Sequence, residues 1–234
     1  MNLVYRGKTK DVYDNGEDGL RLIFSDRVTK NAAGEIDPGG NTVAENTEPG
    51  QGEACLLMAS AIFEELAEKN GVSTHMIAYD LPSLSMDVRR GTMFNPGIEW
   101  IARWVCTGSF LRRYGMVPGV HDGMRFAEPV FEITLKDDAA GDPLVVPSAL
   151  VALGIVEART MSALLDSNAR AMQAIHGMFA ARDLDLWDIK IEWALDEKGA
   201  PMLIDEVSPG CCRAFDMKTG KRVSGKALAE RFRR

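Results

Sequence analysis

The sequence has no long hydrophobic run: no apolar stretch in its 234 residues approaches the roughly 20 residues that a membrane-spanning helix needs. Residues 1–10 also lack the charged-then-apolar order of a secretory signal peptide. Cysteine is scarce, and the four cysteines have neither the spacing of a metal motif nor that of a disulfide framework: Cys55, Cys106, Cys211 and Cys212. We therefore predict a cytoplasmic protein with reduced thiols and no membrane partner.

The sequence also lacks an excess of positive charge. Lysine and arginine total 27 against 34 aspartate and glutamate residues, a formal net charge of -7. This balance argues against broad nucleic-acid binding, although it leaves room for a local cationic pocket. With 46% hydrophobic and 26% charged residues, the composition is that of an ordinary folded protein and excludes a disordered chain.

Several common functional motifs are missing. There is no Walker A motif, and no Gly-x-Gly-x-x-Gly follows a strand, so the usual P-loop and Rossmann interpretations fail. His75, His121 and His176 are too scattered along the chain to predict a zinc site. No Ser-His-Asp or Cys-His arrangement for nucleophilic catalysis is evident either.

The hydrophobic periodicity predicts an α+β fold with mostly antiparallel sheet. Residues 5–13 and 20–24 read as two strands joined by a turn at 14–19, and residues 53–70 and 158–182 read as helices. Further strands are expected at residues 86–90, 98–105 and 130–135. Residues 31–52 hold too many glycines and prolines for regular structure, so they predict either a substrate-covering loop or a disordered one.

The most informative segment is residues 187–193, where strict alternation places Asp188, Lys190 and Glu192 on one face of a strand. The chain turns at residues 196–199 and returns at residues 201–206. If that turn is symmetric, Asp205 lies across from Lys190 on the same face as Glu192.

Two carboxylates beside one lysine would suit a nucleotide bound with Mg²⁺, because this ion favours one or two carboxylates together with phosphate oxygens. Glu192 and Asp205 would then bind the metal, and Lys190 would meet developing negative charge. A solvated polar sheet face explains the same pattern equally well.

Three further segments could recognise anions or polar substrates. Lys8 and Lys10 are two residues apart beside Gly7, which suits phosphate but also describes an exposed edge strand. Arg103, followed by Ser109 in a Thr-Gly-Ser sequence and by two more arginines, suits anion recognition, although two of the arginines could be surface residues of a helix. The acidic segment 136–143 suggests a loop for a metal or a polar substrate.

Taken together and in order, five segments resemble the phosphoribosylaminoimidazole-succinocarboxamide synthase (SAICAR synthase) family of purine biosynthesis. They are residues 7–13, Arg103 with 107–109, 136–143, 188–192 and 205–213. The resemblance implies an ATP-dependent ligase that converts the carboxylate of carboxyaminoimidazole ribonucleotide (CAIR) to an acyl phosphate and joins it to the amine of L-aspartate. The products would be SAICAR, ADP and phosphate.

The resemblance also implies roles for ten residues of this sequence. ATP phosphates would contact Lys8 and Lys10, and Glu192 and Asp205 would bind the nucleotide and its Mg²⁺. Lys190 and Asp188 resemble the family's catalytic pair. The residues that would bind the ribonucleotide are Arg103, Ser109, Arg213 and Arg233.

As architecture, the resemblance implies two lobes with ATP in the cleft between them: residues 1–92, carrying the lysines, and residues 93–234, carrying the metal and ribonucleotide site. Members of the SAICAR synthase family are often homo-oligomers, so the resemblance implies a possible homo-oligomer. One departure concerns the substrate, because Gly210 stands where the family commonly has an aspartate. A related ligase with another carboxylate or amine is therefore one alternative, and a non-catalytic nucleotide-binding protein is another.

Overall fold

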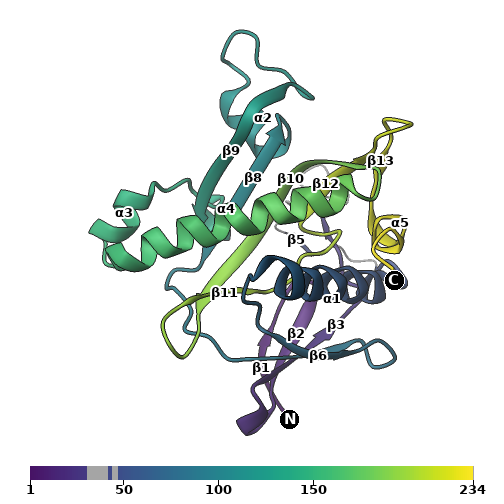
Figure 1. Ribbon diagram of the computed structural model, residues 1–234, viewed down its shortest axis with the longest axis vertical. Coiled ribbons are helices and arrows are strands. Elements are labelled where there is room, and N and C mark those ends of the chain that lie inside the picture. The colour runs from purple at the N-terminus through teal and green to yellow at the C-terminus, as the bar shows by residue number, and fades with distance from the viewer. Residues whose placement is uncertain (31–41, 44–46, 234) are drawn as a thin grey trace.

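Two antiparallel sheets carry most of the strands in the computed structural model, which describes residues 1–30, 42–43 and 47–233 (Figure 1). The first sheet has the order β1-β2-β3-β7-β6. Its strands are β1 (Asn2–Arg6), β2 (Lys10–Asp14), β3 (Leu20–Phe24), β7 (Ser85–Val88) and β6 (Met76–Asp80). The predicted strand over residues 5–13 is therefore wrong in detail, because the chain reverses between β1 and β2 and the Gly7 amide donates to the Lys10 carbonyl at 2.9 Å.

Helix α1 (Gln51–Asn70) packs against the first sheet and confirms the helix predicted at residues 53–70. Most of the apolar residues of α1 are buried. The helix ends before Gly71, which has the left-handed conformation at φ 61°. Glycine suits this position because a Cβ atom is disfavoured at positive φ. α1 also packs against two later helices, α4 (Ala158–Ala180) and α5 (Gly225–Glu230).

The second sheet has the order β13-β12-β10-β8-β9, with β11 also paired to β10. Its strands are β13 (Arg222–Val223), β12 (Cys212–Asp216), β10 (Leu184–Leu195), β8 (Ile98–Val105), β9 (Arg125–Leu135) and β11 (Pro201–Ile204). Helix α4 (Ala158–Ala180) lies along one face of this sheet and packs on β10 and β11 (Figure 1). That leaves the other face available for polar side chains.

The two sheets are joined through one hydrophobic core. The segment before β6 pairs with β11, where the Leu203 amide donates to the Ser73 carbonyl at 2.8 Å and the His75 amide donates to the Leu203 carbonyl at 2.9 Å. One cluster of buried apolar residues contains members of α1, α4 and both sheets. The α+β prediction is confirmed, and the division at residue 92 stays a prediction.

The shorter elements connect these layers. The helices are α2 (Gly108–Tyr114), α3 (Pro147–Ala152) and α5 (Gly225–Glu230); the 3-10 turns are η1 (Gly16–Asp18) and η2 (Asp138–Ala140); and the small sheet pairs β4 (Thr29–Lys30) with β5 (Thr42–Val43). Much of the loop predicted at residues 31–52 lies outside the described residues. Within the described part of the chain, no helix is long and apolar enough to span a bilayer. All four cysteines are free thiols.

Candidate functional site

The polar face of the second sheet is built by alternation along three neighbouring strands. Asp188 of β10 lies opposite Arg103 of β8, and Glu192 lies opposite Glu99. Glu99 in turn lies opposite Thr134 of β9. The intervening residues face α4, so the core includes Trp100, Ile133, Ile189, Ile191 and Trp193. The charges predicted at 188, 190 and 192 do share a face, but Asp188 and Glu192 are buried, at 3% and 4% exposure, so the solvated alternative is wrong.

Lys190 is held by the carboxylates of its neighbouring strands. Its Nζ donates to Glu99 at 2.6 Å and lies 3.8 Å from Glu192. Burial alone would lower the pKa of Lys190, but the negative charges of Glu192 and Glu99 outweigh it and raise that pKa. Lys190 is therefore positively charged over the whole physiological pH range.

Asp205 reaches the same site by a different route from the one predicted. Glu192 lies opposite Ile204, where β11 ends, so Asp205 does not pair across from Lys190. The register differs from the symmetric-turn prediction, and Asp205 leaves the strand in the left-handed conformation at φ 67°. Its carboxylate then meets Lys10 of β2 at 2.8 Å.

The Lys10–Asp205 pair joins the two sheets. Lys10 is buried, and its Nζ also lies 3.4 Å from Glu206. Burial would raise the pKa of Asp205, yet Lys10 and Lys136 lower it, so this carboxylate stays ionised. In contrast, burial and the nearby charge of Asp205 raise the pKa of Glu192.

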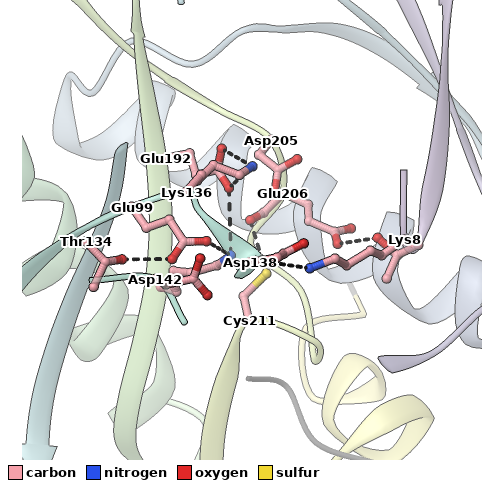
Figure 2. A network of polar contacts seen from close by, with 12 residues as sticks. Lys8, Glu99, Thr134, Lys136, Asp138, Asp142, Glu192, Asp205, Glu206 and Cys211 are labelled. Carbon is pink, nitrogen blue, oxygen red and sulfur yellow. Dashed lines mark hydrogen bonds and ion pairs between the residues drawn. The ribbon is translucent and has the colours of Figure 1, made fainter. Parts of the chain in front are cut away.

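Two loop lysines complete this charged network (Figure 2). Lys136 follows β9 and donates to both carboxylate oxygens of Glu192, at 2.9 and 3.0 Å. Lys8 lies in the bend between β1 and β2, not on a strand as predicted, and pairs with Asp138 at 2.8 Å. Lysines from both sheets therefore meet carboxylates from β10 and from the loop after β11.

A second cluster, centred on Arg103, lies farther along the same sheet face. The Arg103 guanidinium donates to Glu132 at 2.6 Å, to Asp188 at 2.8 Å and to the Ser109 hydroxyl at 2.8 Å. Arg213 of β12 donates to the same Asp188 at 2.6 Å. Gly108 has φ 55°, and a Cβ there would lie 2.9–3.0 Å from the Arg213 guanidinium, so glycine leaves room for this arginine.

Nine of the ten predicted site residues belong to these ion-pair networks or contact them. Arg233 does not: it is exposed and pairs with Glu230 at 2.7 Å and with Glu53 at 3.6 Å. Network residues absent from the predicted site include Glu99, Glu132, Lys136, Asp138 and Glu206. Alternation along residues 98–105 and 130–135 could have identified Glu99 and Glu132, since both face away from an apolar stripe.

Glu192 and Asp205 are the two carboxylates of this site that could bind Mg²⁺. The charge of Asp205 raises the pKa of Glu192, so the two carboxylates lie close together. Glu192 is buried and paired with Lys136, and Asp205 is half-buried and paired with Lys10. Within the described residues, no third histidine, cysteine or carboxylate joins them in a metal-binding group. Two carboxylates fit a Mg²⁺ ion that takes its other ligands from phosphate oxygens and water.

The fold and site thus define a class: an α+β protein of two antiparallel sheets whose facing lysines and carboxylates suit a nucleotide's phosphates and a hard metal ion. The family described as SAICAR synthetase matches residues 3–233. This chain belongs to that family.

Individual relatives agree with this assignment. The phosphoribosylaminoimidazole-succinocarboxamide synthase of Clostridium tetani is 37% identical over 92% of this chain and 92% of its own length. Among solved structures, a SAICAR synthetase in complex with ADP is 26% identical, with a TM-score of 0.81 over 97% of this chain and 93% of that one. Another SAICAR synthetase structure is 31% identical, with a TM-score of 0.77 over 91% and 86% of the two chains.

Proposed function

We propose that this chain is a carbon–nitrogen ligase that joins the carboxylate of CAIR to the amine of L-aspartate and consumes ATP. Family membership along almost the whole chain supports this reaction, and the relative solved with ADP supports a nucleotide substrate. The observation that carries the proposal is the meeting of Lys10, Lys190, Glu192 and Asp205 at one place between the two sheets. The purine pathway, a cytoplasmic location and a homo-oligomer follow as predictions.

The first step makes the carboxylate reactive. A carboxylate oxygen of CAIR attacks the γ-phosphorus of ATP, the bond from that phosphorus to the bridging oxygen breaks, and ADP leaves. Negative charge spreads over the phosphoryl oxygens during this transfer. Lys10 and Lys190 are permanently charged and already oriented by their carboxylate partners, so they offset this charge without reorganising.

The second step forms the amide. The neutral amine of L-aspartate attacks the acyl carbon, and a carbon–nitrogen bond forms. The bond between the acyl carbon and the oxygen that bridges it to phosphorus breaks, so phosphate leaves with the former carboxylate oxygen. The nitrogen releases its extra proton. Arg103 and Arg213, with Ser109, would bind the ribose phosphate, because arginine suits bidentate contact with a dianion.

Mg²⁺ would be held by Glu192 and Asp205, and when bound it would neutralise phosphate charge. In the structure, Lys136 is paired with Glu192 and Lys10 with Asp205, so a lysine balances the charge of each carboxylate.

An isotope experiment tests the reaction path. CAIR labelled with ¹⁸O in its carboxylate is incubated with the protein, Mg-ATP and L-aspartate, and the phosphate and amide products are analysed by mass spectrometry. With both carboxylate oxygens labelled, the proposal predicts one ¹⁸O atom in the phosphate and the other in the amide carbonyl, so the product has the mass of SAICAR that carries one ¹⁸O atom. Unlabelled phosphate beside a normal amount of amide would exclude the acyl phosphate.

A second candidate is a ligase of the same mechanism with another carboxylate or amine. It is favoured by Gly210, which removes a carboxylate that the family resemblance leads us to expect near the ribonucleotide. If CAIR and L-aspartate give no product, the same ADP-release assay with other carboxylates and amines tests this candidate.

A further inference from the structure

Five charged side chains form a row of alternating charge across the second sheet and α2. Glu132 accepts from Arg113 and from Arg103, each at 2.6 Å and each with a different carboxylate oxygen. Asp188 accepts from Arg103 at 2.8 Å and from Arg213 at 2.6 Å. The order of the row is therefore Arg113–Glu132–Arg103–Asp188–Arg213. The family resemblance implies a role for each member except Glu132 and Arg113.

The middle of this row is buried and its ends are more open. The Arg103 and Glu132 side chains are 3% and 5% exposed, whereas Arg213 and Arg113 are 14% and 28% exposed. Three arginines against two carboxylates leave one net positive charge, which suits an anionic ligand. Glu132 therefore supports Arg103 from within the protein, where solvent does not weaken the contact.

Glu132 limits the orientation of the Arg103 guanidinium. This group donates through Nε to Glu132, through Nη1 to Asp188 and through Nη2 to the Ser109 hydroxyl. A guanidinium carries five N–H groups, so these three bonds leave two for a ligand. Because three different nitrogens are bonded, the planar group cannot rotate, and the two remaining N–H groups point in fixed directions.

Arg113 fixes Glu132 in turn. Ser109 and Arg113 are four residues apart on α2, so both lie on one face of this helix. Ser109 meets Arg103 directly, and Arg113 meets Glu132. With one oxygen bonded to Arg113, the Glu132 carboxylate cannot turn away, and its other oxygen stays on Arg103.

We propose that Glu132 is a positioning residue for the ribonucleotide: held by Arg113, it orients the Arg103 guanidinium before the phosphate binds. The proposal rests on the proposed function, in which Arg103 binds the ribose phosphate. A donor that is already oriented loses less conformational entropy on binding than a mobile one. Glu132 thus strengthens phosphate binding although it carries a negative charge itself.

The sign of the effect separates positioning from simple electrostatics. Glu132→Gln removes a negative charge near the phosphate, so Coulomb's law alone predicts tighter binding of a dianion. Its amide can accept from one arginine but not from both, so positioning predicts weaker binding. We expect the KM for CAIR to rise on the order of tenfold, with kcat changed less than about threefold. A KM for CAIR that falls or stays the same overturns the proposal.

Glu128→Gln is the matched control for this measurement. Glu128 lies on β9 with Glu132 and carries the same charge, but it is exposed and is not a member of the row. The KM for CAIR should therefore change less than about twofold in Glu128→Gln.

Binding without turnover separates this proposal from the proposed function. Ribose 5-phosphate carries the same phosphate whatever the carboxylate substrate is, so it is titrated into the full chain with saturating Mg-ADP and followed by ³¹P NMR. Wild type, Glu132→Gln, Arg103→Lys and the double variant form a cycle. Lysine lacks the planar fork that Glu132 orients, so the roughly tenfold loss of affinity in Glu132→Gln should shrink to less than about twofold in the Arg103→Lys background.

The outcomes of this cycle are distinct. Weaker binding in Glu132→Gln that depends on Arg103 supports the positioning role even if CAIR proves to be the wrong carboxylate. An equal loss in both backgrounds marks Glu132 as a structural residue, and no binding by the wild type means that this row does not hold the phosphate. Either of these two results overturns the proposal.

Arg113→Gln keeps the test possible if Glu132→Gln does not fold, because Arg113 lies at the open end of the row. Releasing one oxygen of Glu132 should weaken the binding of ribose 5-phosphate by about two- to fivefold, and this loss should disappear in the Arg103→Lys background. Unchanged binding in Arg113→Gln overturns the proposal. So does a loss that is equal in the two backgrounds, as direct contact between Arg113 and the phosphate would give.

Discussion

Lys190 lies between Glu99 and Glu192, and this pairing determines what its removal would do. Its Nζ donates to Glu99 at 2.6 Å, and Glu192 is 3.8 Å away on the other side. If this ammonium group stabilises the phosphoryl transfer, its two lysine neighbours among the described residues are not free to replace it, because Lys136 is paired with Glu192 and Lys10 with Asp205.

We predict that Lys190→Ala lowers kcat on the order of 10²- to 10³-fold, as expected for loss of one preorganised electrostatic group. The variant also leaves the buried Glu99 without its lysine and removes one of the two lysines near Glu192, so its thermal midpoint should fall. Steady-state ADP release and thermal unfolding measure the two effects, with Lys198→Ala on the exposed turn after β10 as a control for loss of positive charge. Near-normal turnover in Lys190→Ala would remove Lys190 from the chemistry.

His75 carries a pH dependence of stability. Burial lowers its pKa to about 4 from an ordinary value of 6.5. Between these pH values the unfolded chain binds a proton that the folded chain does not, so stability falls as the pH falls through this window. The loss should approach about 3 kcal/mol at pH 4.

His75→Gln removes this titration. We expect the free energy of unfolding of the wild type to drop more steeply between pH 6.5 and pH 4 than that of His75→Gln, when both are measured by urea denaturation without nucleotide or Mg²⁺. Other acid-titrating groups are common to the two proteins and cancel in the comparison. Parallel curves would show that His75 has an ordinary pKa.

At the scale of elements, α1 is the helix whose apolar side chains pack against the first sheet. Ile62, Phe63 and Leu66 on this helix are fully buried. We predict that Ile62→Ala lowers the free energy of unfolding by about 2–5 kcal/mol, and Ile62→Val by about 0.5–1.5 kcal/mol. Chemical denaturation measures both, and equal losses in the two variants would mean that the site does not respond to cavity size.

The helices and the central strands could be predicted from sequence because their periodicity is local. Residues 53–70 gave the helix observed at 51–70, and residues 98–105 gave β8 with the same bounds. The bend at Gly7 was missed, because both lysines fit the alternation of a continuous strand. The register of β11 was also missed, because it depends on the length of the connecting loop: Leu195 pairs with Pro201, so residues 196–200 form the loop and the four-residue turn at 196–199 is one residue too short.

Only part of the site could be predicted, for a related reason. Asp188, Lys190 and Glu192 share a face by their spacing alone. Their partners Glu99 and Lys136 come from β8 and from the loop after β9, and nothing local in the sequence says that β8 lies beside β10. The roles of Lys10 and Arg213 were suggested by family resemblance, and the structure brings both into the ion-pair networks.

At the scale of the whole molecule, the nucleotide would bind where the two sheets meet. Lys10 belongs to the first sheet, and Asp205 follows a strand of the second. A ligand that bridges them stabilises the folded chain by about 2.7 kcal/mol at a concentration of 100 Kd. Binding should therefore raise the thermal midpoint of one cooperative transition.

We predict that ADP raises this midpoint more with Mg²⁺ than with a chelator, and that Glu192→Gln reduces the metal-dependent part of the shift. Glutamine keeps the shape of the side chain and removes the charge that would hold the ion. Differential scanning fluorimetry with and without Mg²⁺ measures the effect. An equal shift in the chelator for the wild type would contradict a metal bound at Glu192 and Asp205.

The most direct test of the account is ADP release by the purified wild type with Mg-ATP, CAIR and L-aspartate, with each of the last two omitted in turn. The account predicts sustained ADP release only when both are present, with one amide formed per ADP, and loss of that release in Lys190→Ala. Two results would contradict the claim that this site makes an amide at the expense of ATP. One is sustained ADP release that does not depend on L-aspartate, and the other is no ADP release with any carboxylate and amine tried.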